Sequence, residues 1–316
     1  MSGFIINPMQ TTNASGLFKL ITTGYIQGHA YNEPATQFQF DTGPLASTET
    51  NPMWGGVALT LGVSGAQSSG TDGAGNSYTI PAPSMFGDTV KRASAVSGST
   101  GINAFSIYNQ NYSSVITAQS NAPLSLPGQS INYARIGSGV KVALGIDPAF
   151  AATLQGGVPN PQFSWDFQGQ QIVPYQAAQS SVTISTIAWA SNTLTITLAA
   201  DAPNLSVGSW FTIAGNVQSG GTLTTLNGTY KVATINHSTF VITVTSTNTN
   251  PFNPISGSIG TTTTAGSVSA VGGALGVNLV DVVTSNSLIV DYNYPTQSGQ
   301  TGNANFVPGA IAIVIL

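Results

Sequence analysis

Residues 181–188 read SVTISTIA and residues 193–199 read TLTITLA, and both segments alternate between apolar and hydroxyl side chains. The same alternation returns at 239–245, TFVITVT. A period of two places one face of a strand against a core and the other face in water, as in an antiparallel sheet. These segments therefore predict antiparallel β-structure, with His237 in a turn between strands.

The rest of the chain is also rich in strand-forming residues. Gly (36) and Pro (17) recur throughout the 316 residues, and Thr, Val, Ile and aromatic residues dominate between them. Short strands with frequent turn signals are typical of β-sandwiches and barrels. We expect a hairpin over 130–146 that turns at 137–139, and a second over 162–175 that turns near 168–169. A third strand pair is expected over 275–294, joined at 284–286.

Helix signals are nearly absent outside one segment. Residues 147–154, DPAFAATL, place Asp147 as an N-cap and Pro148 at the first helical position, and Gly156-Gly157 follows. This pattern predicts a helix of one or two turns. The expected fold class is therefore all-β: a β-sandwich or barrel that carries an inserted small antiparallel β-domain.

Changes in residue composition and in hydrophobic pattern along the chain suggest domain boundaries. The alternating segments lie within 181–266, which we interpret as the inserted domain, and its low-complexity end, from residue 246 on, as an exit linker. The body then comprises 17–180 and 267–316, preceded by a polar N-terminal arm at 1–16. The apolar run AIAIVIL (310–316) is expected to be a buried closing strand or to be covered by another copy.

Charge is scarce: 5% of residues are Asp, Glu, Lys or Arg, against about 25% in ordinary soluble domains. Hydroxyl and amide groups must therefore carry solubility, which suits a particle exterior, and copies of the chain repel one another little. The six cations are scattered and the formal net charge is −4, so we expect no nucleic-acid partner.

Targeting and redox features are also missing from the sequence. The N-terminus lacks a positive segment followed by a long apolar run, so we expect no signal peptide, and no apolar run approaches the length of a membrane span. We therefore expect no membrane partner. Cysteine is absent, so stability does not depend on disulfides and assembly in a reducing host cytoplasm is harmless.

Several stretches resemble one family in the same order along the chain. They are GYIQGHAYNEPATQFQF (24–40), PMWGGVAL (52–59), LGIDPAFAATLQGG (144–157), SWDFQGQQIVPY (164–175) and VNLVDVVTSNSLIVDYNY (277–294). Together they resemble the capsid cement or decoration proteins of tailed bacteriophages, and they cover most of the chain outside 181–266. The motifs PMWGG and SWDF…QIVPY are the most specific. Members associated with these motifs are shorter and lack the insert.

The resemblance implies a β-sandwich or jelly-roll-like body that binds the outer head surface of the virion and bridges neighbouring major capsid subunits, as a homodimer or homotrimer. Because Trp and Met are enriched in interface cores, aromatic and Met side chains of these stretches are the candidate interface residues. They are Tyr25, Tyr31, Met53, Trp54, Trp165 and Phe167. For the Met53-Trp54 pair, an ordinary core position is the alternative. Gly55-Gly56 more simply marks a close backbone approach or a bulge.

Residues capable of chemistry form no convincing constellation. A Ser-His-Asp triad through His29 has no supporting G-x-S-x-G motif, and DGAGN (72–76) lacks the acids of a calcium loop. Asp147 is better explained as a helix cap, and Asp166 as a residue that orients Trp165 and Phe167. We therefore expect no enzyme, no catalytic residues, no cofactor and no metal.

Three functions fit these observations. The first is a structural virion protein that decorates the capsid, with the insert projecting outward. The alternative is a receptor-binding spike or fibre protein of the head or tail, and the third is a carbohydrate-active enzyme or lectin. Fibres tend to show long repeats and none is visible, which favours the head.

Overall fold

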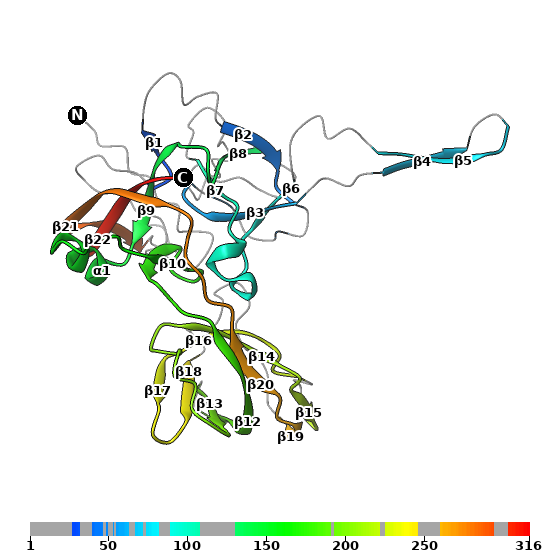
Figure 1. The fold of residues 1–316 in the computed structure, drawn as a ribbon, viewed down its shortest axis with the longest axis vertical. Helices are drawn as coiled ribbons and strands as arrows, with labels where there is room; N and C mark the ends of the chain where they lie inside the picture. Colours follow the sequence, from blue (N-terminus) through cyan, green and yellow to red (C-terminus); the bar gives the residue numbers. More distant parts are fainter. Residues whose placement is uncertain are drawn as a thin grey trace. The chain divides into compact units, whose positions relative to one another are not determined.

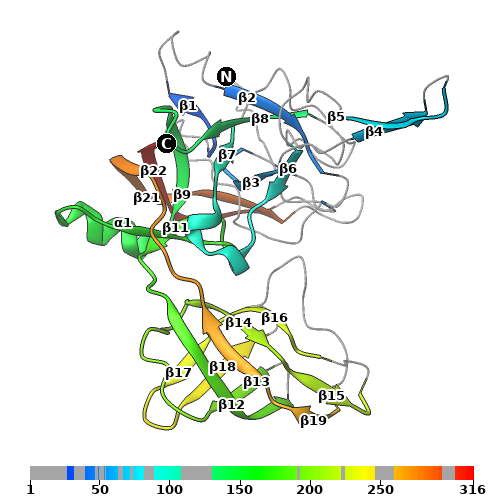
Figure 2. The ribbon, with the colours of Figure 1, turned by 45° about the vertical axis from the view of Figure 1, so that its right-hand side comes forward.

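The computed structural model (Figures 1 and 2) describes the chain in segments that form two compact units. The described residues are 27–31, 40–46, 49, 53, 55–62, 67–71, 74–81, 89–107, 130–190, 193–221, 225–245, 260–293 and 303–316. Unit 1 comprises 1–92, 103–145 and 277–316, and unit 2 comprises 93–102 and 146–276. The expected arm and most of the expected linker lie outside the described residues.

Unit 1 is built from antiparallel strands. Its five-stranded sheet has the order β2-β8-β7-β3-β6, and β4 pairs only with β5 among the described strands. A further group contains β1, β9, β22 and β21, with β22 between β9 and β21. The strands are β1 (Ala30–Tyr31), β2 (Phe40–Pro44), β3 (Ala58–Gly62), β4 (Gln67–Thr71), β5 (Ser77–Pro81), β6 (Thr89–Arg92), β7 (Ala104–Ser106), β8 (Ser130–Arg135), β9 (Lys141–Ile146), β21 (Asn278–Asn293) and β22 (Asn303–Ile315).

Apolar residues of these strands form the interior of unit 1. Val57, Leu59, Phe105 and Tyr133 are each fully buried. The C-terminal run 310–316 is largely buried and forms the end of β22, which pairs with β21. The expectation of a buried closing strand is thus confirmed, because pairing and burial remove the hazard of a free apolar end.

Two expected hairpins in unit 1 were wrong. β8 and β9 do not pair with each other: β8 lies between β2 and β7, whereas β9 pairs with β1 and neighbours β22. The turn at 136–140 therefore carries the chain from one sheet to another. Residues 278–293 form one strand rather than two, because a bulge between Ser285 and Ile289 accommodates the polar residues that read as a turn.

Unit 2 begins with short elements and one hairpin. These are two 3-10 turns, η2 (Ala95–Ser97) and η3 (Ser99–Gly101), the helix α1 (Pro148–Gln155), and strands β10 (Phe163–Asp166) and β11 (Gln171–Pro174). The Asp147 carboxylate accepts a hydrogen bond from the Phe150 backbone N–H at 2.8 Å, which confirms the predicted cap and helix. β10 and β11 pair antiparallel, which confirms the hairpin at 162–175.

Residues 179–270 form the remaining sheets of unit 2. The strands are β12 (Gln179–Ala190), β13 (Thr193–Leu198), β14 (Trp210–Ala214), β15 (Val217–Ser219), β16 (Gly228–Lys231), β17 (Thr234–Asn236), β18 (Val241–Thr245), β19 (Thr261–Thr264) and β20 (Ser267–Ala270). Seven follow the order β16-β14-β20-β12-β13-β18-β17, and β15 pairs with β19. We call residues 179–270 the β-module.

The β-module closes around one hydrophobic core. A bulge between Ile184 and Thr186 divides β12, so that its first half pairs with β20 and its second half with β13. Both halves of the sheet contribute to the same buried cluster, including Leu194 and Ile196 from β13 and Phe211 from β14. The alternation that predicted these strands appears as alternating burial along β13 and β18.

The all-β prediction is therefore confirmed, whereas the jelly-roll connectivity stays a prediction. The predicted insert, 181–266, lies within the β-module, and its separation from the body as a domain stays a prediction. Unit 2 also contains 93–102 and 146–178, which the sequence-based division assigned to the body. Among the described residues, no helix is long and apolar enough to cross a membrane.

Candidate functional site

The candidate interface residues lie in different environments. Met53 is 2% exposed, Trp165 is 1% exposed and Phe167 is 8% exposed. Tyr31 is in β1, opposite Lys141, while Tyr25 and Trp54 fall outside the described residues. Burial of Met53 agrees with the core alternative, and the interface role of all six stays a prediction.

The Gly55-Gly56 pair lies where two backbones approach closely. A Cβ on Gly56 would lie 2.5 Å from the Gln27 side chain, and a Cβ on Gly28 would lie 2.3 Å from the Gly55 carbonyl carbon. Gln27 is fully buried and its Nε2 donates to the Gly56 carbonyl at 3.2 Å. The interpretation of the PMWGG glycines as a close backbone approach is confirmed.

Described acidic side chains are engaged in bonds that hold the fold. The pairs are Asp41 with Arg135, Glu49 with the Arg92 backbone N–H, Asp147 with the Phe150 backbone N–H, Asp166 with Lys231, Asp201 with His237, and Asp281 with the Val282 backbone N–H. Burial lowers the pKa of Arg92 to about 10, and Glu49 opposes that shift. Arg92 therefore stays charged at neutral pH.

The two histidines, His237 and His29, lie in different units. His237 lies in the turn between β17 and β18, as expected, with Nδ1 2.7 Å from an Asp201 carboxylate oxygen. This pair is well exposed, which limits its contribution to stability. His29 is exposed and its backbone carbonyl accepts from Ala143. In the described part of the chain, no three His, Asp or Glu side chains form a group that could hold a metal ion.

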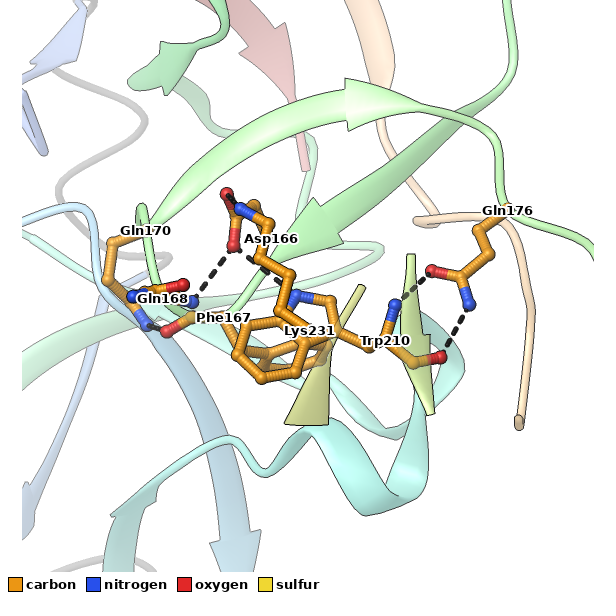
Figure 3. A network of polar contacts seen from close by, with 7 residues as sticks. All are labelled: Asp166, Phe167, Gln168, Gln170, Gln176, Trp210 and Lys231. Atoms are coloured by element: carbon orange, nitrogen blue, oxygen red, sulfur yellow. Dashed lines mark hydrogen bonds and ion pairs between the residues drawn. The ribbon is translucent and has the colours of Figure 1, made fainter. Parts of the chain in front are cut away.

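A polar network in unit 2 surrounds the buried carboxylate of Asp166 (Figure 3). Lys231 Nζ lies 2.6 Å from Asp166 Oδ2, and the Trp210 indole N–H donates to Oδ1 at 3.3 Å. The Gln168 backbone N–H donates to the same Oδ1 at 3.0 Å. Asp166 ends β10, whereas Trp210 and Lys231 belong to the β-module. The carboxylate therefore ties the β10–β11 hairpin to the β-module within unit 2.

The aromatic and amide side chains around Asp166 reinforce the same junction. Phe167 meets Trp210 edge to face, with centroids 6.3 Å apart and planes at 85°. Gln176 uses both ends of its side-chain amide: Nε2 donates to the Trp210 backbone carbonyl at 2.7 Å, and Oε1 accepts from the Trp210 backbone N–H at 3.1 Å. The amide thus pairs with β14 as a neighbouring strand would. We call Asp166, Phe167, Gln176, Trp210 and Lys231 the clamp.

A pocket of about 540 Å³ lies beside the clamp, and all of its lining residues belong to unit 2. Its wall comes from the helix cap, from β11 and the residues that follow it, from the loop 203–209, and from the end of β16. Lining residues that could contact a ligand include Asp147, Asp166, Tyr175, Asn204, Val207 and Lys231. Tyr175 is 46% exposed and Val207 is 67% exposed.

Sequence reasoning placed Asp166 beside Trp165 and Phe167 but did not find Lys231 or Trp210 as its partners. They lie 65 and 44 residues further along the chain. The available signal was the scarcity of charge: a lone Lys in a strand and a lone Asp inside an apolar stretch are each expensive to bury without a partner. Sequence reasoning also missed the pocket, because its lining residues are scattered along the chain.

Comparisons with protein-family models, with curated proteins and with solved structures found no match to this chain.

Proposed function

We propose that this chain is a structural virion protein that binds the outer surface of a phage capsid and reinforces contacts between major capsid subunits. One observation carries the proposal: the acids whose side chains are described form ion pairs or accept hydrogen bonds from backbone N–H groups within an all-β fold. In the described part of the chain, these acids therefore serve the fold itself. The family resemblance of the body points the same way.

The mechanism is mechanical. A chain that binds assembled capsid but not free subunits stabilises the capsid by mass action, and many modest contacts per particle add through avidity. With a formal net charge of only −4, copies of the chain crowd together at little electrostatic cost. A homodimer or homotrimer would increase the avidity further.

The clamp gives the β-module a role in this proposal. A module presented outward on a particle must transmit force to its base, and the clamp joins the β-module to the β10–β11 hairpin with a buried ion pair and an amide that pairs with a strand. Such a junction resists local unfolding better than a flexible tether.

Co-sedimentation of the purified chain with expanded and with unexpanded phage heads tests the proposal. The expected result is saturable binding to expanded heads and greater resistance of the decorated heads to heat. Equal and weak binding to both head forms would count against it. Variants of the clamp residues Gln176, Trp210 and Lys231 should bind heads like the wild type, because these three residues support the β-module and are not among the candidate interface residues.

A further inference from the structure

The pocket beside the clamp has the size of a small-molecule site. Its volume of about 540 Å³ falls within the range of about 300–1,000 Å³ that such sites occupy. Tyr175 offers an exposed aromatic ring, and Val207 an exposed apolar side chain. Asn204 and Ser206, with their amide and hydroxyl groups, line the same pocket.

The charges of the lining narrow the class of ligand. Lys231 and Asp166 neutralise each other in a pair 2.6 Å apart, and Asp147 adds one further negative charge. A phosphate, sulfate or uronic acid would find no uncommitted cation in this lining. An apolar ligand would cover the Asn204 carbonyl oxygen and the Lys231 ammonium and would offer neither a hydrogen bond in place of water, which is costly. A neutral polar ligand fits best.

A saccharide matches the remaining features. A sugar ring has an apolar C–H face that stacks on an aromatic ring and a rim of hydroxyls that pair with amides and carboxylates. The Asn204 side chain donates through Nδ2 to the Ala178 carbonyl at 2.6 Å, which fixes the amide while its oxygen remains an acceptor. The Lys231 ammonium group has three N–H donors. One donates to Asp166, and another can donate to a sugar hydroxyl.

We propose that this pocket binds a neutral saccharide without cleaving it. Two carboxylates line the pocket, as a glycoside hydrolase would require. However, Asp147 accepts the capping bond of α1, and Asp166 accepts from Lys231, Trp210 and Gln168. Both carboxylates already accept hydrogen bonds within the fold, whereas a general acid must donate a proton to the leaving group. Saccharide binding at this pocket is a second activity that does not require a capsid, so the isolated chain should show it.

Titration of the purified full-length chain with neutral sugars tests the proposal. The probes are glucose, galactose, mannose, rhamnose and N-acetylglucosamine, each as a monosaccharide and as a disaccharide, followed by saturation-transfer NMR and calorimetry. We expect binding of at least one probe, loss of about tenfold in affinity in Tyr175→Ala, and near wild-type affinity in Tyr175→Phe, which keeps the ring. Val158→Ala, at an exposed valine of unit 2 outside the pocket, is the matched control.

Each outcome is decisive for the pocket alone. Binding that depends on the Tyr175 ring, with no sugar released, supports the proposal. Absence of binding to every probe, or binding that Tyr175→Ala leaves unchanged, overturns it. Release of monosaccharide from a disaccharide overturns the claim that the pocket binds without cleavage. Failure of the chain to bind phage heads would leave all of these results unaffected.

Discussion

At the scale of single residues, Asp166 and Lys231 show how a charge-poor protein uses the charges it keeps. The Asp166 side chain is 5% exposed and that of Lys231 is 21% exposed, so the ion pair is largely shielded from water. Removal of one partner leaves the other charge buried without its counterion. The resulting loss of folding free energy exceeds the net stabilisation that the ion pair itself contributes. The pair is therefore a sensitive site in unit 2.

We expect Lys231→Met to destabilise unit 2 by about 3 kcal/mol. His237→Asn, which breaks an exposed pair with Asp201 in the same unit, should cost below about 0.5 kcal/mol. Urea unfolding followed by tryptophan fluorescence measures both, since Trp165, Trp189 and Trp210 belong to unit 2. Asp166→Asn combined with Lys231→Met should recover part of the loss. Equal effects of the two single variants would contradict this account of the clamp.

Tyr230 provides a pH-dependent test at the same scale. Its hydroxyl donates to the Leu226 carbonyl at 2.6 Å, and burial raises its pKa to about 12. In the unfolded chain the tyrosine hydroxyl has a pKa of about 10. The contribution of neutral Tyr230 to folding stability is therefore complete below pH 10 and is lost as the pH rises towards 12. The midpoint temperature of thermal unfolding of unit 2 should fall over that pH range by more in the wild type than in Tyr230→Phe. Parallel pH profiles for the two proteins would refute the assignment.

Individual residues also show what sequence reasoning can reach. The Asp147 cap and the glycines of PMWGG were predictable, because a cap and a close backbone approach leave local signatures. Asn216 was not. It is fully buried, its Nδ2 donates to Thr264 and Ala265, and its Oδ1 accepts from Leu226. Those partners are distant in sequence, so no local pattern indicates them.

At the scale of elements, strands were easier to predict than their partners. Alternation located β12, β13 and β18 because burial on one face is a local property of a strand. It could not show that β8 and β9 pair in different places, or that a bulge lets β21 run through its polar segment, since pairing depends on the whole sheet. Of the expected hairpins, the one with a short connection that pairs as predicted is β10–β11.

Two glycines of the β-module form a matched pair for testing its packing. Gly266 has a φ of +82°, and a Cβ there would lie 2.4 Å from the Ala214 carbonyl oxygen. Gly220 has a φ of +81°, and a Cβ there would meet nothing within 4 Å. Gly266→Ala should therefore cost about 3 kcal/mol or more, and Gly220→Ala only about 1 kcal/mol of backbone strain.

Differential scanning calorimetry of the two glycine variants separates backbone strain at positive φ from the steric clash of the new Cβ with its neighbours. A larger loss in Gly266→Ala, with unit 1 unaffected, is the expected result. Similar losses in both variants would mean that backbone conformation alone sets the cost and that the approach of β14 to the turn before β20 is looser than the structure indicates.

At the scale of the whole molecule, the scarcity of charge makes a prediction about assembly. Contacts between hydroxyl, amide and apolar surfaces are screened by salt far less than ion pairs are. The affinity of the chain for expanded heads should therefore change by less than about threefold between 50 mM and 500 mM salt. A steep loss of affinity over that range, measured by co-sedimentation, would indicate a charged interface and contradict the proposed mode of binding.

The number and position of copies on purified virions test the proposed function most directly. Quantitative mass spectrometry would count the chain relative to the major capsid protein, and gold-labelled antibodies against 181–266 would locate it by electron microscopy. The account predicts hundreds of copies per particle, with label over the whole outer surface of the head. Absence of the chain from virions, or a few copies with label confined to the tail, would contradict it.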